Sequence, residues 1–517
     1  MERKKRDLFG LEREEAVLKQ KKIIGAVAAG CALLAILIIF LVSRGRAGAG
    51  KSGTESTASV ESAVVTATPE PTQPAQKAET QVNFPHSEGF TEKVTILSTG
   101  DNLIHEALYQ DAESPDEQGY YDFRPIYAEV KPLIEAADLA TVNMETPLAT
   151  SIGDPSGYPH FNSPRGAGYA LIDAGFDVIN HANNHVMDMG AEGVYATLDY
   201  WAGYDMPVVG AYRSSDDMYD IRILESNGIR VAFLGIAEFL NYDIPSDSRL
   251  CVPFFSDGGL VEDLIKTAKA EADIVVVHAH WGEENEDVIT DTMSVMSQRM
   301  VDWGADIIFG NHTHIVQDLK ILTRESDGQL CPVILSGGNF VSGQKERSHL
   351  LSGLEVVTAA KNPDTGEVEI ENVEYLPVVT HYEGDRKNVR IIPVDKYTDE
   401  QAAKHGVVDF EGEPMTKDYL YELIDAHIPS QFIVTTDTIS IKDKAAEMAS
   451  ADAAEESAAA SVSEDTESAE EASGTDEAAE TGGGEEDTGE TEDEEDGEDN
   501  GGEYDEYDEY DEDDGEE

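Results

Sequence analysis

The spacing of apolar residues divides this chain into a middle region that can fold and two ends of different character. From Lys93 to about Val394, short runs rich in Val, Ile and Leu alternate with longer amphipathic segments. Short β-branched runs are typical of buried strands, and the longer segments are typical of helices. The pattern therefore predicts one α/β domain, which we place at residues 91–395, a length that fits a single domain.

Several of the strand-like runs end in polar side chains. The runs VTILSTGD, LATVNMET, DVINHANNH, DIVVVHAHWG, DIIFGNHTH and PVILSGGNF end at or near Asp101, Glu145, Asn184, His280, His312 and Asn339. In an open α/β sheet, ligand sites form at the carboxyl ends of the strands, so residues distant in sequence meet there. Each motif alone is more often structural. Together they supply the mixed nitrogen and oxygen donors that Zn, Mn or Fe accept, which predicts one metal site built from several loops.

The segment 23–43, IIGAVAAGCALLAILIIFLVS, has no charged residue and is long enough to cross a bilayer as a helix. Basic residues are denser in residues 1–22 than after the segment, which favours a cytoplasmic N-terminus. We expect a single-pass protein of the cell membrane with its main domain outside the cytoplasm. A cleaved signal peptide and a lipoprotein signal ending at Cys31 are the alternatives. The run is longer than a signal peptide requires and stays apolar past Cys31, which favours the uncleaved anchor.

The segments beside the predicted domain differ from it in composition. Residues 44–90 are rich in Ala, Ser, Thr, Gly and Pro, which predicts a flexible linker. Residues 396–445 form a C-terminal appendage, with the helical run DYLYELIDAHI followed by the strand-like run QFIVTTDTISI. Residues 446–517 are a low-complexity acidic tail, which we expect to be disordered.

Charge is concentrated in that tail. The formal net charge is −69, and residues 451–517 hold 33 acidic residues with no Lys or Arg. Such a tract repels itself and is either a solvated spacer or a weak binder of divalent cations or cell wall. No basic patch with interleaved aromatic residues occurs in the middle region, so we expect no nucleic-acid partner.

The cysteines give no disulfide framework. Cys31 lies in the apolar run, and Cys251 and Cys331 are widely separated in the sequence. In an oxidising compartment Cys251 and Cys331 either pair or remain two separate buried thiols.

Residues 94–343, about half of the chain, resemble a known family. The blocks TGDNLIHEALY, VNMETPLA, GFDVINHANNHVMDMGAEGVYATLDYW, HAHWGEENE, WGADIIFGNHTHIVQ and LSGGNFVSGQ are similar to those of the CapA-type poly-γ-glutamate capsule-synthesis proteins. That family belongs to the calcineurin-like metallophosphoesterase superfamily. The resemblance implies a four-layer α/β/β/α sandwich and a dinuclear site for divalent Mn, Zn or Fe.

The resemblance also implies a role for each matched residue. Asp101 and His314 would bind one metal ion. Asn184, His280 and His312 would bind the other, with Glu145 bridging both, and His185 would donate a proton to the leaving group.

Some positions depart from the superfamily pattern. Asn102 and Leu103 follow Asp101 where the superfamily has Asp-x-His, so His105 is either a displaced ligand or a loop residue. Val186 stands where the superfamily has an acid, with Asp188 two residues further on. Glu284, after the His-Trp-Gly block, is a candidate substrate-binding residue. His181 and His278 are expected to pack or to orient the ligands.

Two functions fit these residues. The first is a metal-dependent hydrolase of phosphoesters, or of another ester or amide bond, in cell-envelope material. The second is an accessory subunit that works with synthase or export subunits on an anionic polymer such as poly-γ-glutamate. The presence of His185 together with every expected ligand favours the first.

Overall fold

The computed structural model describes residues 81–115, 117–407 and 412–450. All described residues belong to one compact unit. The predicted anchor at 23–43, most of the linker and the tail from residue 451 lie outside the described residues. None of the helices in the described part is long and apolar enough to span a bilayer.

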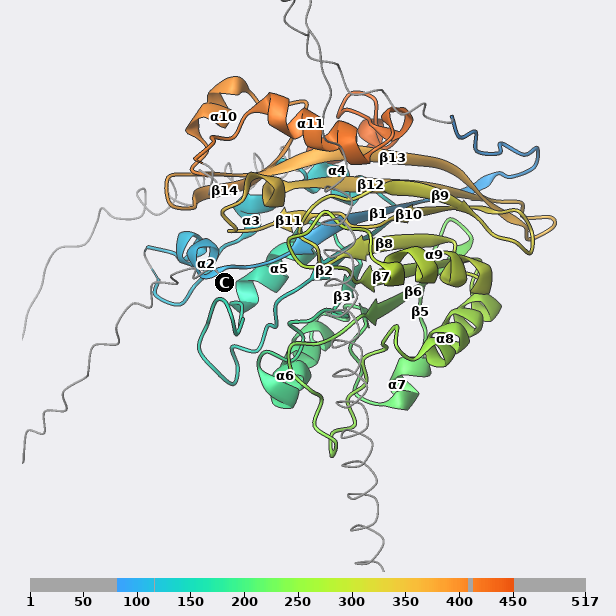
Figure 1. Cartoon of the computed structure of the whole chain (residues 1–517), viewed down its shortest axis with the longest axis horizontal. Helices are drawn as coiled ribbons and strands as arrows, with labels where there is room; N and C mark the ends of the chain where they lie inside the picture. The colour runs from blue at the N-terminus through green and yellow to red at the C-terminus, as the bar shows by residue number, and fades with distance from the viewer. Residues whose placement is uncertain (1–80, 116, 408–411, 451–517) are drawn as a thin grey trace, which may run out of the picture. The chain divides into compact units, whose positions relative to one another are not determined.

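Two β-sheets form the centre of the domain (Figure 1). The first has the strand order β14-β13-β12-β1-β2-β3-β4, with β11 also paired to β1, and the second has the order β5-β6-β7-β8-β10-β9. Strands of the first sheet are β1 (Glu92–Asn102), β2 (Leu139–Met144), β3 (Val178–Asn180), β4 (Val208–Val209), β11 (Asn339–Val341), β12 (Leu351–Lys361), β13 (Val368–Glu383) and β14 (Lys387–Pro393). Those of the second are β5 (Arg222–Ser226), β6 (Ile229–Ala237), β7 (Ile274–His280), β8 (Ile307–Asn311), β9 (Leu319–Thr323) and β10 (Leu330–Ile334).

Strand β7 shows why these segments form sheets. Its sequence IVVVHAH is β-branched for four residues and is buried throughout, as expected for a central parallel strand covered on both faces. Val275, Val277 and Ala279 pack toward the helices, whereas Ile274 and Val276 join the main core. The period of two therefore directs His280 to the same side as Val276, away from the helices.

Helices cover the outer sides of the sheets. α8 and α9 bury Leu264 and Met300 against the second sheet. α10 and α11 lie over the β12–β14 part of the first sheet (Figure 1). The α/β class predicted from the sequence is confirmed. The helices are α2 (Glu106–Ala112), α3 (Arg124–Tyr127), α4 (Lys131–Ala136), α5 (Arg165–Asp173), α6 (Gly190–Ala202), α7 (Ser215–Tyr219), α8 (Gly258–Glu271), α9 (Asp291–Trp303), α10 (Asp399–Lys404) and α11 (Lys417–His427), with 3-10 turns at η1 (Arg347–Leu350) and η2 (Ser430–Phe432).

The C-terminal appendage is part of the same core, and one part of its prediction is wrong. Helix α11 forms where DYLYELIDAHI predicted it and buries Leu420 and Ile424. The run 431–441 is not a strand, because it makes a 3-10 turn and then further turns. Local hydrogen bonds replace strand pairing: the Thr435 N–H donates to Thr438 Oγ1 at 2.9 Å. Residues 442–450 are helical, so helix continues into the first residues assigned to the tail.

The last residues of the predicted linker lie against this appendage. The Val82 N–H donates to Gln431 Oε1 at 3.0 Å, and the rings of Phe84 and Phe432 are 6.3 Å apart. The Ser87 hydroxyl donates to Glu369 at 2.7 Å. The folded domain therefore begins before residue 91.

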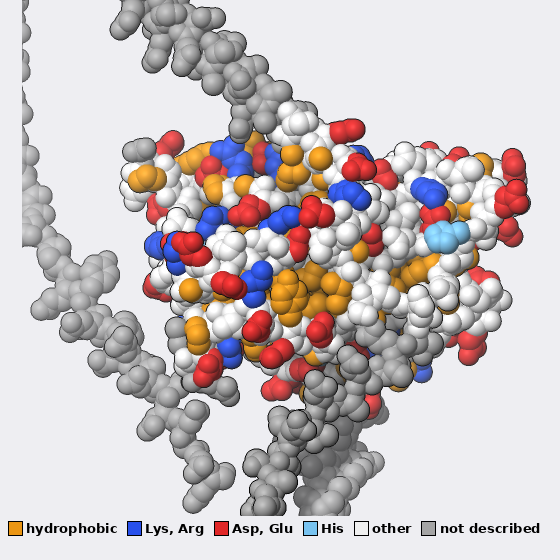
Figure 2. All heavy atoms as spheres, turned by 90° about the horizontal axis from the view of Figure 1, so that it is seen from above, with side chains coloured by type: hydrophobic (Ala, Val, Ile, Leu, Met, Phe, Trp, Pro, Cys, Tyr) orange, Lys and Arg blue, Asp and Glu red, His pale blue; other side chains and the backbone are white. Residues whose placement is uncertain are grey.

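The described residues also show the charge distribution on one face and the state of two cysteines. On the face shown in Figure 2, seen from the side of α10 and α11, Lys and Arg side chains are interspersed with Asp and Glu and form no continuous basic area. Cys251 and Cys331 are both free thiols, and Cys331 is fully buried. Cys31 lies outside the described residues.

Candidate metal centre

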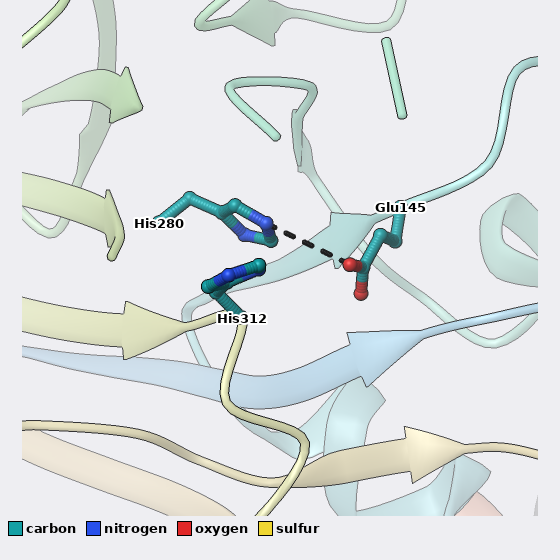
Figure 3. A group of neighbouring side chains, drawn as sticks. All are labelled: Glu145, His280 and His312. Carbon is teal, nitrogen blue, oxygen red and sulfur yellow. Dashed lines mark ion pairs between the residues drawn. The ribbon is translucent and has the colours of Figure 1, made fainter. Parts of the chain in front are cut away.

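The carboxyl ends of the two sheets bring five predicted ligands together. Glu145, His280 and His312 form one group, and Asp101, Glu145 and His314 form a second. Within each group the ligand atoms lie within 4.8 Å of one another, and all five side chains are buried. Figure 3 shows the two histidine rings and the Glu145 carboxylate meeting from different segments. Glu145 belongs to both groups, which is the position of a bridging ligand.

Strand register explains the convergence. In the first sheet, Asp101 at the end of β1 lies opposite Asn143 of β2 and Asn339 of β11. In the second, His280 lies opposite Asn311, the residue before His312. Because parallel strands end at a common edge, side chains distant in sequence meet there.

A glycine allows the backbone to close up behind Asp101. A Cβ built on Gly100 would lie 2.0 Å from the Gly338 carbonyl oxygen, so no larger residue fits there. The close approach permits a hydrogen bond of 2.8 Å from the Asp101 N–H to the Gly338 carbonyl. The glycine of the TGD block therefore serves to position the carboxylate.

The two histidines of the GNHTH block have unusual backbone conformations. His312 has a φ of 99° and His314 has a φ of 60°, in the left-handed region that non-glycine residues seldom occupy. Such strain concentrates where a function requires a particular side-chain direction. Here it turns both imidazoles toward the carboxylates.

Several polar atoms of the centre are buried without a hydrogen-bond partner among the described residues. They are both carboxylate oxygens of Glu145, both ring nitrogens of His312 and the Nδ1 atom of His280. A buried polar atom without a partner costs about 1–3 kcal/mol. These are lone-pair donors of the kind that divalent transition metals accept, so the residues fit a metal centre.

Charge coupling within the centre is strong. Burial and the nearby Asp101 carboxylate raise the pKa of Glu145 well above its usual range. Burial opposes protonation of His314, but Glu145 and Asp101 raise its pKa well above the usual value. Burial lowers the pKa of His312 to about 4. The Nδ1 atom of His314 lies 3.3 Å from Asp101 Oδ2, and His280 Nε2 lies 3.6 Å from Glu145 Oε1.

Asn184 and His185 approach from the loop after β3. The Asn184 Oδ1 atom is 2.9 Å from His280 Nε2, so its carbonyl oxygen faces the first ligand group. His185 Nδ1 is 2.8 Å from Asp188 Oδ2, which also accepts from the Phe161 N–H at 2.9 Å. Asp188 thus supplies the carboxylate that Val186 lacks. It fixes the His185 ring through Nδ1 and leaves Nε2 for other contacts.

Other candidate residues are placed differently. The His105 Nδ1 atom accepts from the Gly343 N–H at 3.1 Å, and His105 belongs to neither ligand group. Glu284 Oε1 is 3.6 Å from His314 Nε2, at the border of a surface pocket. His181 accepts from the Trp201 indole N–H at 2.8 Å, and His278 bonds to the Thr141 hydroxyl at 2.9 Å.

The sequence patterns assigned no role to two residues that hold ligands, Asn143 and Asn339, although Asn339 ends one of the strand-like runs. The Asn143 amide donates to Asp101 Oδ1 at 2.7 Å, and Asn339 Oδ1 lies 3.0 Å from His314 Nδ1. Both stand at ends of strand-like runs, so their position was the available signal. Strand register, which assigns each amide to its ligand, has no signal in a single sequence.

Comparison with known proteins identifies the family that the middle of the chain matches. Residues 95–344 match the family "Bacterial capsule synthesis protein PGA_cap". The PGA biosynthesis protein CapA of Bacillus subtilis (strain 168) is 30% identical over 252 residues, which cover 48% of this chain and 64% of the relative. The capsule biosynthesis protein CapA of Bacillus anthracis is 29% identical over 279 residues, covering 52% of this chain and 64% of the relative. The matched domain belongs to this CapA-type family of capsule-synthesis proteins, and it spans less than two thirds of either relative.

Solved structures give weaker similarities. A hypothetical protein from Thermus thermophilus has 18% identity and a TM-score of 0.30, covering 54% of this chain and 99% of that one. The 5'-nucleotidase of Candida albicans has 14% identity and a TM-score of 0.31, and the match covers 66% of this chain and 59% of that one. Both scores are too low to bear on function.

Proposed function

We propose that this protein is a metal-dependent hydrolase of a phosphoester, or of another ester or amide bond, in cell-envelope polymer synthesis. One observation carries the proposal: Glu145 is fully buried between two ligand groups with neither carboxylate oxygen hydrogen bonded to a described residue. Two divalent cations, of Mn, Zn or Fe, would supply partners for both oxygens. Asp101 and His314 would hold one, Asn184, His280 and His312 the other, with Glu145 between them.

Bound divalent cations would polarise the scissile group and lower the pKa of a water molecule near them. The side chains of this chain define the rest of the reaction. His185, held by Asp188 through Nδ1, presents Nε2 as the proton donor to the leaving group. Phe161 packs edge-on against the His185 ring with 4.8 Å between centroids and limits its movement. Burial of the ligands excludes bulk water from the metal-binding atoms.

The cellular setting is also a proposal. An anchor at residues 23–43 would hold the domain at the outer side of the cell membrane, where envelope polymers are assembled. The names of the two Bacillus relatives, both for biosynthesis of PGA or capsule, support a role beside polymer-synthase or export subunits. An accessory subunit without catalysis is the competing outcome.

The test is hydrolysis by the purified full-length protein with and without added Mn²⁺. A phosphodiester and a phosphomonoester serve as probes, with wild type beside His312→Ala and the matched buried control His278→Ala. His278 lies two residues before His280 on β7 but belongs to neither ligand group. We expect Mn²⁺-dependent turnover in wild type and the control, and a loss of at least about 100-fold in His312→Ala, as for removal of a metal ligand.

Folding of each variant is followed by circular dichroism on the same samples. Folded wild type that binds Mn²⁺ without hydrolysing either probe or an ester or amide analogue would favour the accessory subunit. Equal activity in His312→Ala and wild type would contradict the metal centre as the reaction site.

A further inference from the structure

A pocket of about 980 Å³ lies beside the metal centre. Three segments distant in sequence form most of its wall: residues 105–107, residues 343–349, and Arg386 at the turn between β13 and β14. Glu284, which also lines it, is 3.6 Å from the ligand His314. The pocket therefore lies directly beside the metal centre, with Glu284 between them.

Two cations line this pocket, Lys345 and Arg386. Among the described residues, no carboxylate lies within ion-pair distance of the Lys345 ammonium group. Arg386 is 16% exposed, its Nη1 atom pairs with the exposed Asp385, and its Nη2 atom has no partner in the described part of the chain. A guanidinium with a free edge matches carboxylate and phosphate oxygens.

Hydrogen bonds link Arg386 to His105, and they link Gln344, the neighbour of Lys345, to the metal centre. Arg386 Nε donates to the Gly343 carbonyl at 2.5 Å, and the Gly343 N–H donates to His105 Nδ1 at 3.1 Å. His105 therefore carries its proton on Nε2, as a further donor. Beside Lys345, Gln344 accepts at 2.6 Å from the amide of Asn339, whose Oδ1 atom contacts His314. The Arg386 guanidinium and the residue beside Lys345 are therefore each held by hydrogen bonds.

The acidic residues of the pocket are already engaged. Glu106 accepts from the Gln110 amide at 2.8 Å, one turn along α2. Glu284 faces His314, with 3.6 Å between its Oε1 atom and His314 Nε2. Glu346 also has a partner. A ligand would therefore meet the Lys345 ammonium group, which has no ion pair among the described residues, and the Nη2 edge of Arg386, whose Nη1 atom already pairs with Asp385.

We infer that this pocket binds a second anionic group of the substrate, a carboxylate or a phosphate, on Lys345 and Arg386. The inference rests on the proposed function for the place of the scissile bond, which lies at the metal centre. It defines the substrate class as a molecule with at least two anionic or phosphorylated positions, such as a segment of an anionic polymer. His105, not grouped with the metal ligands, acts here as a neutral donor.

Direct binding tests this inference without requiring turnover. Three fluorescent pentapeptides of equal length, made of Glu, phosphoserine or Gln, are titrated by anisotropy with the full-length protein, once with Mn²⁺ and once with EDTA. Wild type is compared with Lys345→Glu and with Lys442→Glu. Lys442 is exposed, has no ion pair among the described residues and gives the same change of net charge.

We expect the Glu or the phosphoserine peptide to bind at least tenfold more tightly than the Gln peptide. Lys345→Glu should weaken that binding about tenfold or more, and Lys442→Glu less than twofold. The tighter of the two acidic peptides identifies the group as carboxylate or phosphate.

Equal effects of Lys345→Glu and Lys442→Glu, equal binding of the Gln peptide, or no binding of any peptide would overturn the inference. Its failure is distinct from failure of the proposed function. Acidic-peptide binding through Lys345 by a protein that holds no metal would contradict the proposed function alone.

Discussion

Strands β7 and β8 have buried polar side chains near both ends. At one end these side chains have hydrogen-bond partners, and at the other end several of their atoms have none among the described residues. Before β8, Asp306 accepts from Arg324 at 2.6 Å, from Lys269 at 2.7 Å and from the Val275 N–H at 2.8 Å. At the other end, His280 and His312 have buried ring nitrogens with no hydrogen-bond partner among the described residues, and so does the carboxylate of Glu145, which follows β2.

The contrast separates structural from functional burial. A charge buried for structure is surrounded by partners, because an unpaired one costs several kcal/mol. The same fold could have supplied hydrogen-bond partners to the buried polar atoms at both ends of these strands. Unpaired ligand atoms, together with the left-handed backbone of His312, indicate that this edge is shaped for a bound ion at the expense of the metal-free fold.

The largest expected effect lies at the structural end. Asp306→Ala removes the buried ion-pair partner of Arg324, which is 5% exposed and keeps only the exposed Asp327 at 3.1 Å. We expect the free energy of unfolding to fall by about 3–5 kcal/mol, the cost of breaking a buried pair. Urea unfolding measures it. The metal content per folded chain should stay at the wild-type value. A fall in the free energy of unfolding of less than about 1 kcal/mol would show that the Asp306 end of the strands is not a strongly paired structural site.

Next in size is the effect of the proton donor on the reaction. His185→Gln should lower kcat about 100-fold on a substrate with a poor leaving group, as for loss of a general acid. Metal content should be unchanged. A substrate with a nitrophenol leaving group, which needs no proton, should lose much less. Equal losses on both substrates would exclude His185 as the donor.

At the metal edge, one substitution should stabilise the metal-free protein. Glu145→Gln removes a buried carboxylate that has no hydrogen-bond partner among the described residues, so the free energy of unfolding in EDTA at pH 8 should rise by about 2 kcal/mol. Added Mn²⁺ should raise the Tm of wild type and not that of the variant. A variant less stable than wild type in EDTA would show that Glu145 is a structural partner.

The smallest effect concerns Glu355, a buried acid of β12 whose pKa burial raises to about 8. Its folded pKa is above its unfolded value of about 4.3, so the folded state binds more protons between the two. Stability should therefore fall as pH rises through this window and level off above about pH 8. Glu355→Gln should reduce that slope and make the protein more stable at pH 8, measured by urea unfolding in EDTA. An unchanged slope would contradict it.

Much of the site could be predicted because parallel strands end at a common edge. The apolar runs marked the strands, and their last residues marked the ligands Asp101, Glu145, His280 and His312. The residues that hold these ligands could not be assigned in this way. Asn143 reaches Asp101 only through the register of β1 and β2, which depends on packing between segments distant in sequence.

The appendage shows the opposite kind of error. The run 431–441 is β-branched and apolar enough to predict a strand. In the structure Ile439 and Ile441 are buried, but they lie in turns. Ser440 donates to Glu374 of β13 with both its N–H and its hydroxyl, and Thr435 bonds to Thr438. Local side-chain hydrogen bonds outweighed strand propensity there.

We propose above all that Glu145 lies between two divalent cations. Native mass spectrometry of the full-length protein, equilibrated with Mn²⁺ at pH 7.5, tests it directly with wild type beside Glu145→Gln. We expect about two bound ions per wild-type chain and loss of at least one in the variant, as a bridging ligand requires. Wild type that stays folded without binding Mn²⁺, Zn²⁺ or Fe²⁺, or a variant that binds the same number of ions as wild type, would contradict the account.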